Sequence, residues 1–200
     1  ILLVPPGPAD RQARLAGLTI CWTRWDEQDP VARIMRWLPA GPVRTADIQI
    51  DLTRTDYPSP RPEAPWQPTF WHGRTSVFAH QGRLRLWDMA STLDLDPEAG
   101  TLHGAIAPAS LEDGHTFAHA TLVIAIALLM RGRARYHLHG GLVTVPEVGP
   151  VLVAGDAGQG KSTTTLALLT AGGRFVADDT LFADDNGKLH GLAKPLNVSA

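Results

Sequence analysis

The sequence predicts an α/β protein with a mixed, partly antiparallel sheet, preceded by a small N-terminal α+β lobe. Two observations lead to this prediction. Short apolar runs separated by turn residues recur between Thr75 and Ile106, which is typical of antiparallel strands. After an apolar segment that ends near Arg131, strand and helix patterns alternate from Leu142 to Ala177, which is typical of α/β units.

Composition and charge limit the classes of function. The chain has 200 residues, 44% of them hydrophobic and 19% charged, which suits one sizeable core or a core plus a smaller lobe. The formal net charge of -2 lacks the positive excess that gathers nucleic acid or an anionic membrane, so we expect neither partner. Cys21 is the only cysteine, which excludes an internal disulfide and a thiolate zinc cluster and fits a reducing compartment.

The longest apolar stretch runs from Phe117 to Met130 and is interrupted by His119. It is shorter than the roughly 20 residues that a membrane-spanning helix needs, so we expect a core helix. The opening residues have no basic region of the kind that begins a signal peptide. These features favour a cytoplasmic protein.

The N-terminal lobe is predicted to mix strands with one short helix. A β-branched apolar run from Leu18 to Trp25 predicts a strand, and Asp29-Pro30 is typical of an N-cap and first helical residue. The helix that follows presents one apolar face, formed by Val31, Ile34, Met35 and Leu38. A half-buried strand is then indicated by the alternation of Ile48, Ile50 and Leu52.

The stretch from Pro58 to Pro68 separates this lobe from the rest. Its five prolines exclude a regular helix or a central strand, so it is either a linker or a loop laid over the surface. We therefore predict an N-terminal lobe over residues 1–68 and a larger domain over residues 69–200.

The larger domain is predicted to begin with a β-meander and a helix. The meander comprises Val77 to His80, a Gln81-Gly82 turn, Leu84 to Trp87 and Thr101 to Ile106. Ser110, with Asp113 three residues later, resembles a capping box, so the apolar helix should begin there. It should end at Arg131, closed by Gly132. The later elements are predicted as strands at Leu142 to Val145, Val151 to Ala154 (buried) and Phe175 to Ala177, and a helix at Ser162 to Thr170.

A phosphate-binding pattern lies between the predicted strand Val151 to Ala154 and the predicted helix Ser162 to Thr170. The run from Gly155 to Ser162 matches G-x-x-x-x-G-K-[ST] directly after an apolar strand and directly before a helix. Glycines let backbone N–H groups point at phosphates, and the helix N-terminus adds partial positive charge. Lys161 can neutralise β and γ oxygens, and the Ser162 hydroxyl can ligate Mg²⁺. The residues expected to bind nucleotide are Gly155, Asp156, Ala157, Gly158, Gln159, Gly160, Lys161, Ser162 and Thr163.

Two acidic residues follow the strand Phe175 to Ala177. Asp178 and Asp179 are expected at the sheet edge where α/β proteins bind ligands, so one carboxylate can reach Mg²⁺ while the other faces an attacking nucleophile. Successive residues on a strand point to opposite sides, which suits this division. The alternative is a solvated Asp-Asp turn. We expect such a turn at Asp184-Asp185, because Asn186-Gly187 behind it is a hairpin signal.

Three segments together resemble the HPr kinase/phosphorylase group of bacterial serine kinases. They are His139-Gly140, the loop from Gly155 to Ser162, and Val176-Ala177-Asp178-Asp179. That family has an HG segment, a GDSGxGKS loop and a VADD strand at very similar spacing, and phosphoenolpyruvate carboxykinases share the loop and the Asp-Asp pair more distantly. The resemblance covers about Leu128 to Leu192. It implies a P-loop core of the HPr kinase/carboxykinase type, and it extends to stand-alone relatives such as lasso-peptide precursor kinases.

The resemblance also implies roles for individual residues. Asp178 would be the base on a substrate serine hydroxyl, His139 would interact with that base, and Asp179 would help hold the metal beside Ser162. It further implies the cofactors ATP and Mg²⁺, a protein or peptide substrate that carries a serine, and a homo-oligomer. The sequence departs from the family in two places: Ala157 stands where a serine is usual, and Thr163 where an acidic residue is usual.

Weaker signals each have two readings. All six tryptophans lie between Trp22 and Trp87, where core packing is favoured over a groove for an extended peptide. Arg131, Arg133 and Arg135 either clamp a phosphorylated product or, as we favour, satisfy a helix C-terminus. No metal is assigned to the histidines without ligand spacing, which are His72, His80, His103, His115, His119, His137 and His190.

Three functional hypotheses follow. The first is an ATP-dependent kinase that phosphorylates a serine on a protein or peptide, with Asp178, His139 and Lys161 as catalytic residues. The second is a small-molecule enzyme of the carboxykinase type, for which the additional basic and metal-binding residues are not found. The third is a nucleotide-sensing module or motor ATPase without a phosphate acceptor, although the signature motif of ABC-type ATPases is missing from the sequence.

Overall fold

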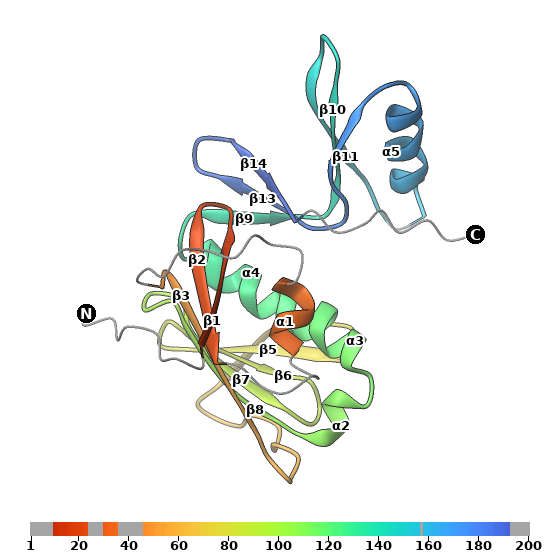
Figure 1. Cartoon of the computed structure of the whole chain (residues 1–200). Coiled ribbons are helices and arrows are strands. Elements are labelled where there is room, and N and C mark those ends of the chain that lie inside the picture. Colours follow the sequence, from red (N-terminus) through yellow and green to blue (C-terminus); the bar gives the residue numbers. More distant parts are fainter. Residues whose placement is uncertain (1–9, 24–29, 36–45, 157, 193–200) are drawn as a thin grey trace. The chain divides into compact units, whose positions relative to one another are not determined.

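The chain forms two compact units, Ile1–Arg133 and Ala134–Ala200. The computed structural model describes residues 10–23, 30–35, 46–156 and 158–192 (Figure 1). The sequence places a boundary between residues 68 and 69, but that point falls within a strand of the first unit. The strand remains paired with the next one along the chain, so contacts divide the chain about 65 residues later, after Arg133.

The first unit contains one eight-stranded sheet with the order β1-β2-β3-β8-β7-β6-β5-β4. Strand β2 pairs in parallel with β3, and β3 with β8, while the other neighbours are antiparallel, so this sheet is mixed, although both parallel pairs include β3, a strand of the predicted N-terminal lobe. The strands are β1 (Asp10–Leu15), β2 (Leu18–Thr23), β3 (Ile48–Arg54), β4 (Gln67–His72), β5 (Thr75–His80), β6 (Arg83–Trp87), β7 (Thr92–Asp96) and β8 (Thr101–Ile106).

The core of this unit lies on the face of the sheet that the helices cover. Ile48, Ile50 and Leu52 are all buried, which confirms the alternation predicted for β3. Helix α1 (Pro30–Met35) begins at Pro30 as predicted. The predicted contribution of Leu38 to its apolar face lies outside the described residues.

The long apolar segment is divided into several helical pieces. These are α2 (Pro108–Leu111), α3 (Gly114–Thr116), the π-helical η1 (Phe117–Leu122) and α4 (Val123–Arg131), with Gly132 as the C-cap. The N-cap is Asp113, whose side chain accepts a hydrogen bond from the Thr116 amide at 3.1 Å. Ser110, expected as the cap, is instead buried and bonded to the Ser91 hydroxyl at 2.6 Å. Among the described residues, no helix is both long and apolar enough to cross a bilayer.

Arg133 ties the end of this helical segment to the sheet loops. Its guanidinium donates hydrogen bonds to the backbone carbonyls of Asp47, Pro97 and Glu98 at 3.3, 3.1 and 3.0 Å. These partners belong to loops beside the sheet rather than to the helix C-terminus that the sequence suggested. Arg133 is thus held as a structural residue in the first unit.

The proline-rich stretch is a loop laid over the sheet, which decides between the two readings of Pro58 to Pro68. Trp87 Nε1 donates to the Ser59 carbonyl at 3.0 Å, and the Ser59 amide donates to the carbonyl of Ala90 at 2.7 Å. Near its end, Trp66 stacks with the Arg85 guanidinium, 4.3 Å from the ring centroid. The loop is therefore anchored at both ends of the stretch.

The described part of the second unit has two three-stranded sheets and one helix. The orders are β11-β10-β12 and β14-β13-β9, and every pairing is antiparallel. The elements are β9 (Arg135–Leu138), β10 (Gly140–Val145), β11 (Gly149–Ala154), α5 (Lys161–Thr170), β12 (Arg174–Ala177), β13 (Leu181–Asp184) and β14 (Leu189–Gly191). The predicted hairpin at Asn186-Gly187 is confirmed as the β13–β14 turn.

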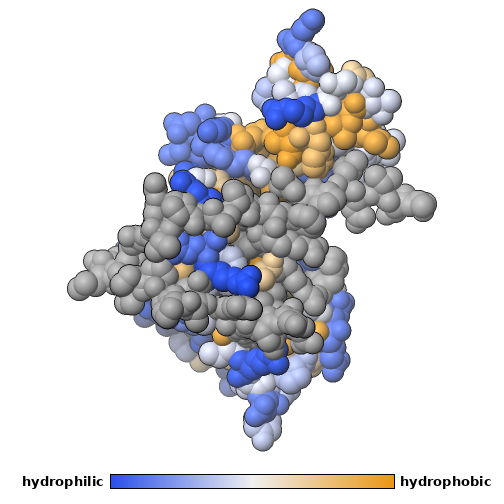
Figure 2. Space-filling model, viewed as in Figure 1, coloured by the Kyte–Doolittle hydropathy of each residue, from blue (hydrophilic) through white to orange (hydrophobic). Residues whose placement is uncertain are grey.

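Helix α5 packs against β10 and β11. The approach to β10 is close, because a Cβ on Gly141 would lie 2.3 Å from the Thr165 hydroxyl, so the position requires glycine. Strand β11 was predicted to be buried but alternates between half-buried and exposed residues, and Leu152 is 39% exposed. It is the end strand of its sheet with the helix on one side, and Figure 2 shows apolar surface on this unit.

Candidate functional site

The antiparallel pairing of β10 with both of its neighbours gathers the predicted site at one sheet edge. Gly140 is opposite Ala154, and Leu142 is opposite Ala177, so β10 starts where β11 and β12 end. His139, at the start of β10, the loop after β11 and the aspartates after β12 therefore all leave the sheet at the same edge. This convergence joins three segments that are well separated in the sequence.

The loop from Gly155 to Ser162 turns through two glycines in the left-handed region. Gly158 has a φ of 81° and Gly160 a φ of 78°, values that L side chains rarely adopt. Gly160 is also the N-cap of α5, so the backbone enters the ten-residue helix directly from the loop. Ala157, one of the residues expected to bind nucleotide, lies outside the described residues.

Two side chains of the loop bind the loop's own backbone. Lys161 Nζ donates to the carbonyl of Asp156 at 3.0 Å, and Gln159 Oε1 accepts a hydrogen bond from the Asp156 amide at the same distance. The amide oxygen of Gln159 therefore occupies a backbone donor of the kind that binds anions in such loops. The sequence motif treats position 159 as free to vary, so it gives no signal for this contact.

Ser162 and Thr163 lie in the first turn of α5. Ser162 is half-buried and Thr163 is exposed. The first amides of a helix have no partner within the helix, and its N-terminus carries partial positive charge that attracts anions such as phosphate. The structure thus places Lys161 and Ser162 beside the loop, as the motif predicts.

The two aspartates differ in burial and in backbone conformation. Asp178 is 2% exposed, whereas Asp179 is half-buried and has a φ of 63°. The Asp178 carbonyl accepts a hydrogen bond from the Thr180 amide at 2.8 Å, which closes a tight turn after β12. A left-handed φ at an aspartate is uncommon and costs energy, so the turn is held by its surroundings.

His139 is linked to this turn through the backbone. Its Nδ1 lies 3.0 Å from the carbonyl oxygen of Asp179, so Nδ1 carries the proton in this contact. The resemblance implied an interaction with the base at position 178, and the described contact is instead with the neighbouring residue. His139 therefore holds the aspartate turn against the start of β10.

A small apolar cluster lies next to the aspartate turn. Leu142, Ala177 and Leu181 are buried together, with Leu138, Val176 and Leu189 packed against them. The Leu192 amide donates to the Thr180 carbonyl at 3.1 Å, which ties the turn to the chain beyond β14. Both three-stranded sheets thus contribute to fixing Asp178.

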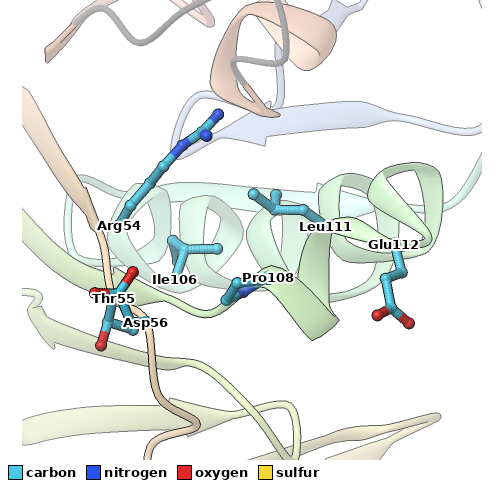
Figure 3. A pocket seen from close by; sticks show the side chains of 7 residues that line it. All are labelled: Arg54, Thr55, Asp56, Ile106, Pro108, Leu111 and Glu112. Carbon is cyan, nitrogen blue, oxygen red and sulfur yellow. The ribbon is translucent and has the colours of Figure 1, made fainter.

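A separate cavity of about 340 Å³ lies in the first unit, between the ends of β3 and β8 and helix α2. Ile106, Pro108 and Leu111 supply its apolar lining, and Figure 3 shows Arg54 pointing to the opposite side from the Glu112 carboxylate. Ligand sites usually combine an apolar pocket with convergent polar groups. Because the charged groups here diverge, we assign this cavity no role.

The second unit matches a known family. The model of the HPr Serine kinase C-terminal domain matches residues 133–197, almost the whole extent of this unit. The second unit is HPr kinase-like. The HPr kinase-like unit thus contains all three segments of the site, and its first matched residue lies at the boundary between the two compact units.

Curated relatives match about a third of the chain. The HPr kinase/phosphorylase of Limosilactobacillus reuteri (strain DSM 20016) is 47% identical over 68 residues, which is 33% of this chain and 21% of that protein. That of Streptococcus thermophilus (strain ATCC BAA-491 / LMD-9) is 48% identical over 59 residues, 28% of this chain and 19% of that protein. That of Lacticaseibacillus casei (strain BL23) is 41% identical over 64 residues, which is 31% of this chain and 20% of that protein. The chain thus spans about a fifth of the length of these relatives, and no solved structure matches it.

The side chain of Asp184, in the β13–β14 hairpin of the HPr kinase-like unit, is held by several hydrogen bonds. Its Oδ2 lies 3.1 Å from His190 Nε2, and its Oδ1 accepts hydrogen bonds from the Asn186 and Lys188 amides at 3.0 and 2.9 Å. The hydrogen bond with His190, followed by those from the two amides, lowers the pKa of Asp184 below its ordinary 3.8, although burial acts in the opposite direction. The sequence predicted a solvated turn at Asp184-Asp185. The turn is present, but Asp184 is half-buried and Asp185 is the exposed residue of the pair.

This pKa shift predicts acid sensitivity of the hairpin. Because the folded-state pKa is lowered, the stabilisation by Asp184 is fully present above about pH 4 and is lost as the pH falls through the folded value. In urea unfolding between about pH 5 and pH 2, wild type should lose more free energy of unfolding than Asp184→Asn. The control is Asp185→Asn, which should follow wild type. Parallel pH curves for wild type and Asp184→Asn would contradict the assignment.

Proposed function

We propose that the HPr kinase-like unit is the Mg²⁺ and ATP site of a phosphotransferase that phosphorylates a serine hydroxyl on a protein or peptide. The observation that carries this proposal is the meeting of the glycine loop, Asp178-Asp179 and His139 at one sheet edge. The names of the curated relatives, HPr kinase/phosphorylase, support the same reaction. A cytoplasmic location, which the sequence leads us to expect, would supply ATP to this site.

The residues at this edge fit the implied nucleotide and metal. Gly158 and Gly160 give the loop the left-handed turns that aim backbone amides at one point, and Lys161 adds a positive charge. The Ser162 hydroxyl and the Asp179 carboxylate are oxygen donors of the kind that Mg²⁺ prefers. When bound, the metal would neutralise charge on the phosphate oxygens.

Asp178 is proposed as the base. In the transfer, the serine Oγ forms a bond to the γ-phosphorus, the bond to the β–γ bridging oxygen breaks, and ADP leaves. The hydroxyl proton passes to the Asp178 carboxylate. Asp178 is buried, so its carboxylate is shielded from bulk water, and His139 positions the turn that carries it.

Gln159 holds a backbone amide that phosphate would contact, and Lys161, which would itself contact phosphate, is bonded to a backbone carbonyl. A phosphate oxygen would have to displace Gln159 Oε1 from the Asp156 amide and draw Lys161 from the Asp156 carbonyl. Gln159 thus acts as an internal competitor of the nucleotide in this proposal.

Removal of the competing side chain should strengthen nucleotide binding. A hydrogen bond contributes a net of about 0.5–1.5 kcal/mol, so Gln159→Ala should lower the Kd for Mg·ATP by roughly two- to tenfold. Isothermal titration calorimetry measures this, with Lys161→Ala as the variant expected to lose binding. Weaker binding by Gln159→Ala would mean that the side chain contacts the nucleotide and would refute its role as a competitor.

The transfer itself is tested with ATP labelled at the γ-phosphate. Candidate acceptors are purified HPr, which the names of the relatives mention, and synthetic serine peptides. General-base catalysis contributes about 10²- to 10⁴-fold, so Asp178→Asn should slow transfer at least about 100-fold. Lys161→Ala should abolish transfer, and Asp185→Asn should match wild type. If Asp178→Asn transfers as fast as wild type, the base has been assigned wrongly.

The same assay separates the remaining hypotheses. A nucleotide-sensing module would bind ATP without labelling any polypeptide, and a carboxykinase-type enzyme would act on oxaloacetate with a nucleotide. No observation in the described residues favours either over the serine kinase.

A further inference from the structure

Strand β4 closes one end of the eight-stranded sheet and, among the described residues, pairs only with β5. All six of its residues are exposed. Phe70 is 43% exposed and Trp71 80%, although large apolar side chains at a sheet edge are usually covered. The outer N–H and C=O groups of such a strand are ready to pair with another extended segment.

The two ends of this sheet differ in how they resist pairing. At the opposite end, β1 contains Arg11 and Arg14, and charges on an edge strand discourage the addition of another strand. Strand β4 contains no charged residue. Pro68 and the register shift between Pro68 and Phe70 both disturb pairing near the start of β4, so the usable edge runs from Thr69 to His72.

The register of β4 puts its two aromatic residues on opposite faces. Trp71 is opposite Ser76, whereas Phe70 is opposite Val77. An added strand would place alternate side chains beside Trp71 on one face and beside Phe70 on the other. The edge therefore suits a segment with apolar or β-branched residues on both faces.

Arginines flank this edge in the sequence, and one of them, Arg74, lines a small cavity together with Asp88 and Asp113. Residues 61–85 contain four arginines and a single acidic residue, Glu63. Arg83 and Arg85 pair with Asp96 and Asp94. Among the described residues no ion pair involves Arg61 or Arg74, which precede and follow the strand. Acidic groups at the ends of a bound segment would therefore be attracted.

We propose that the edge of β4 from Thr69 to His72 binds an extended segment of a partner polypeptide by strand addition, with apolar side chains on both faces and acidic residues at its ends. A four-residue edge spans about 13 Å, and a stable dimer usually buries at least about 1,200 Å², so a peptide segment fits better than a second copy of the chain. Main-chain hydrogen bonds supply affinity in this mode, and side-chain pockets supply selectivity. The inference goes beyond the phosphotransfer and uses no residue of the loop site.

The test is fluorescence anisotropy with the full chain and a fluorescein-labelled heptapeptide. The peptide has glutamate at both ends and alternating valine and isoleucine between them, so that apolar side chains lie on both faces of the added strand. Wild type should bind it saturably, and Trp71→Ala should bind at least tenfold more weakly. Tyr57→Ala is the matched control, because Tyr57 is 79% exposed in the same unit but lies outside β4, and it should bind within twofold of wild type.

Two altered peptides and one further variant sharpen the result. A proline at the central position should weaken binding at least tenfold, because it removes a main-chain donor, and lysine at both ends should also weaken it. Lys161→Ala should bind the peptide as wild type does, so a failure of the phosphotransfer proposal would leave this result unchanged.

Several results would overturn the inference. They are no saturable binding by wild type, equal binding of the proline peptide, and equal binding by Trp71→Ala. A sedimentation mass twice that of one chain for wild type, reduced to one chain by Trp71→Ala, would mean that a second copy occupies the edge, and would also overturn it.

Discussion

The position of β10 between two antiparallel neighbours is the constraint on which the candidate site depends. Because β11 and β12 both run opposite to β10, they run in the same direction as each other and end at one edge. A single strand thereby brings a phosphate-binding loop and a pair of aspartates together without a larger parallel sheet. The close approach of α5 at Gly141 keeps the helix that follows the loop against this same strand.

The parts of this site that the sequence predicted are those with a local signal. The loop, its strand and its helix follow from glycines and apolar runs that are adjacent in the chain. Strands β10 and β12 were also predicted, but neither their order nor their directions could be, because pairing joins residues distant in sequence. The contact of His139 with the Asp179 carbonyl depends on that pairing, so it could not be predicted from the sequence.

The errors in the sequence interpretation have the same physical origin. Ser110 has the residue type of a helix cap, but a buried hydrogen bond to Ser91 uses its hydroxyl, and Asp113 caps instead. The apolar run of β11 has the composition of a central strand, yet it lies at the end of its sheet and Leu152 remains exposed. The stretch from Pro58 to Pro68 gave no sign of whether it crosses the sheet, because its anchors, Trp87 and Ala90, lie some 20 residues or more away in the sequence. Local pattern predicts elements, whereas packing decides what they cover.

The central claim is that three separate segments form one nucleotide site. Hydrogen exchange followed by mass spectrometry, with and without Mg·ATP, tests this most directly. Our account expects protection together at the loop from Gly155 to Ser162, at Asp178-Asp179 and at His139-Gly140, and expects Lys161→Ala to lose all three. Protection of the loop alone, with the other two segments unchanged, would contradict the claim.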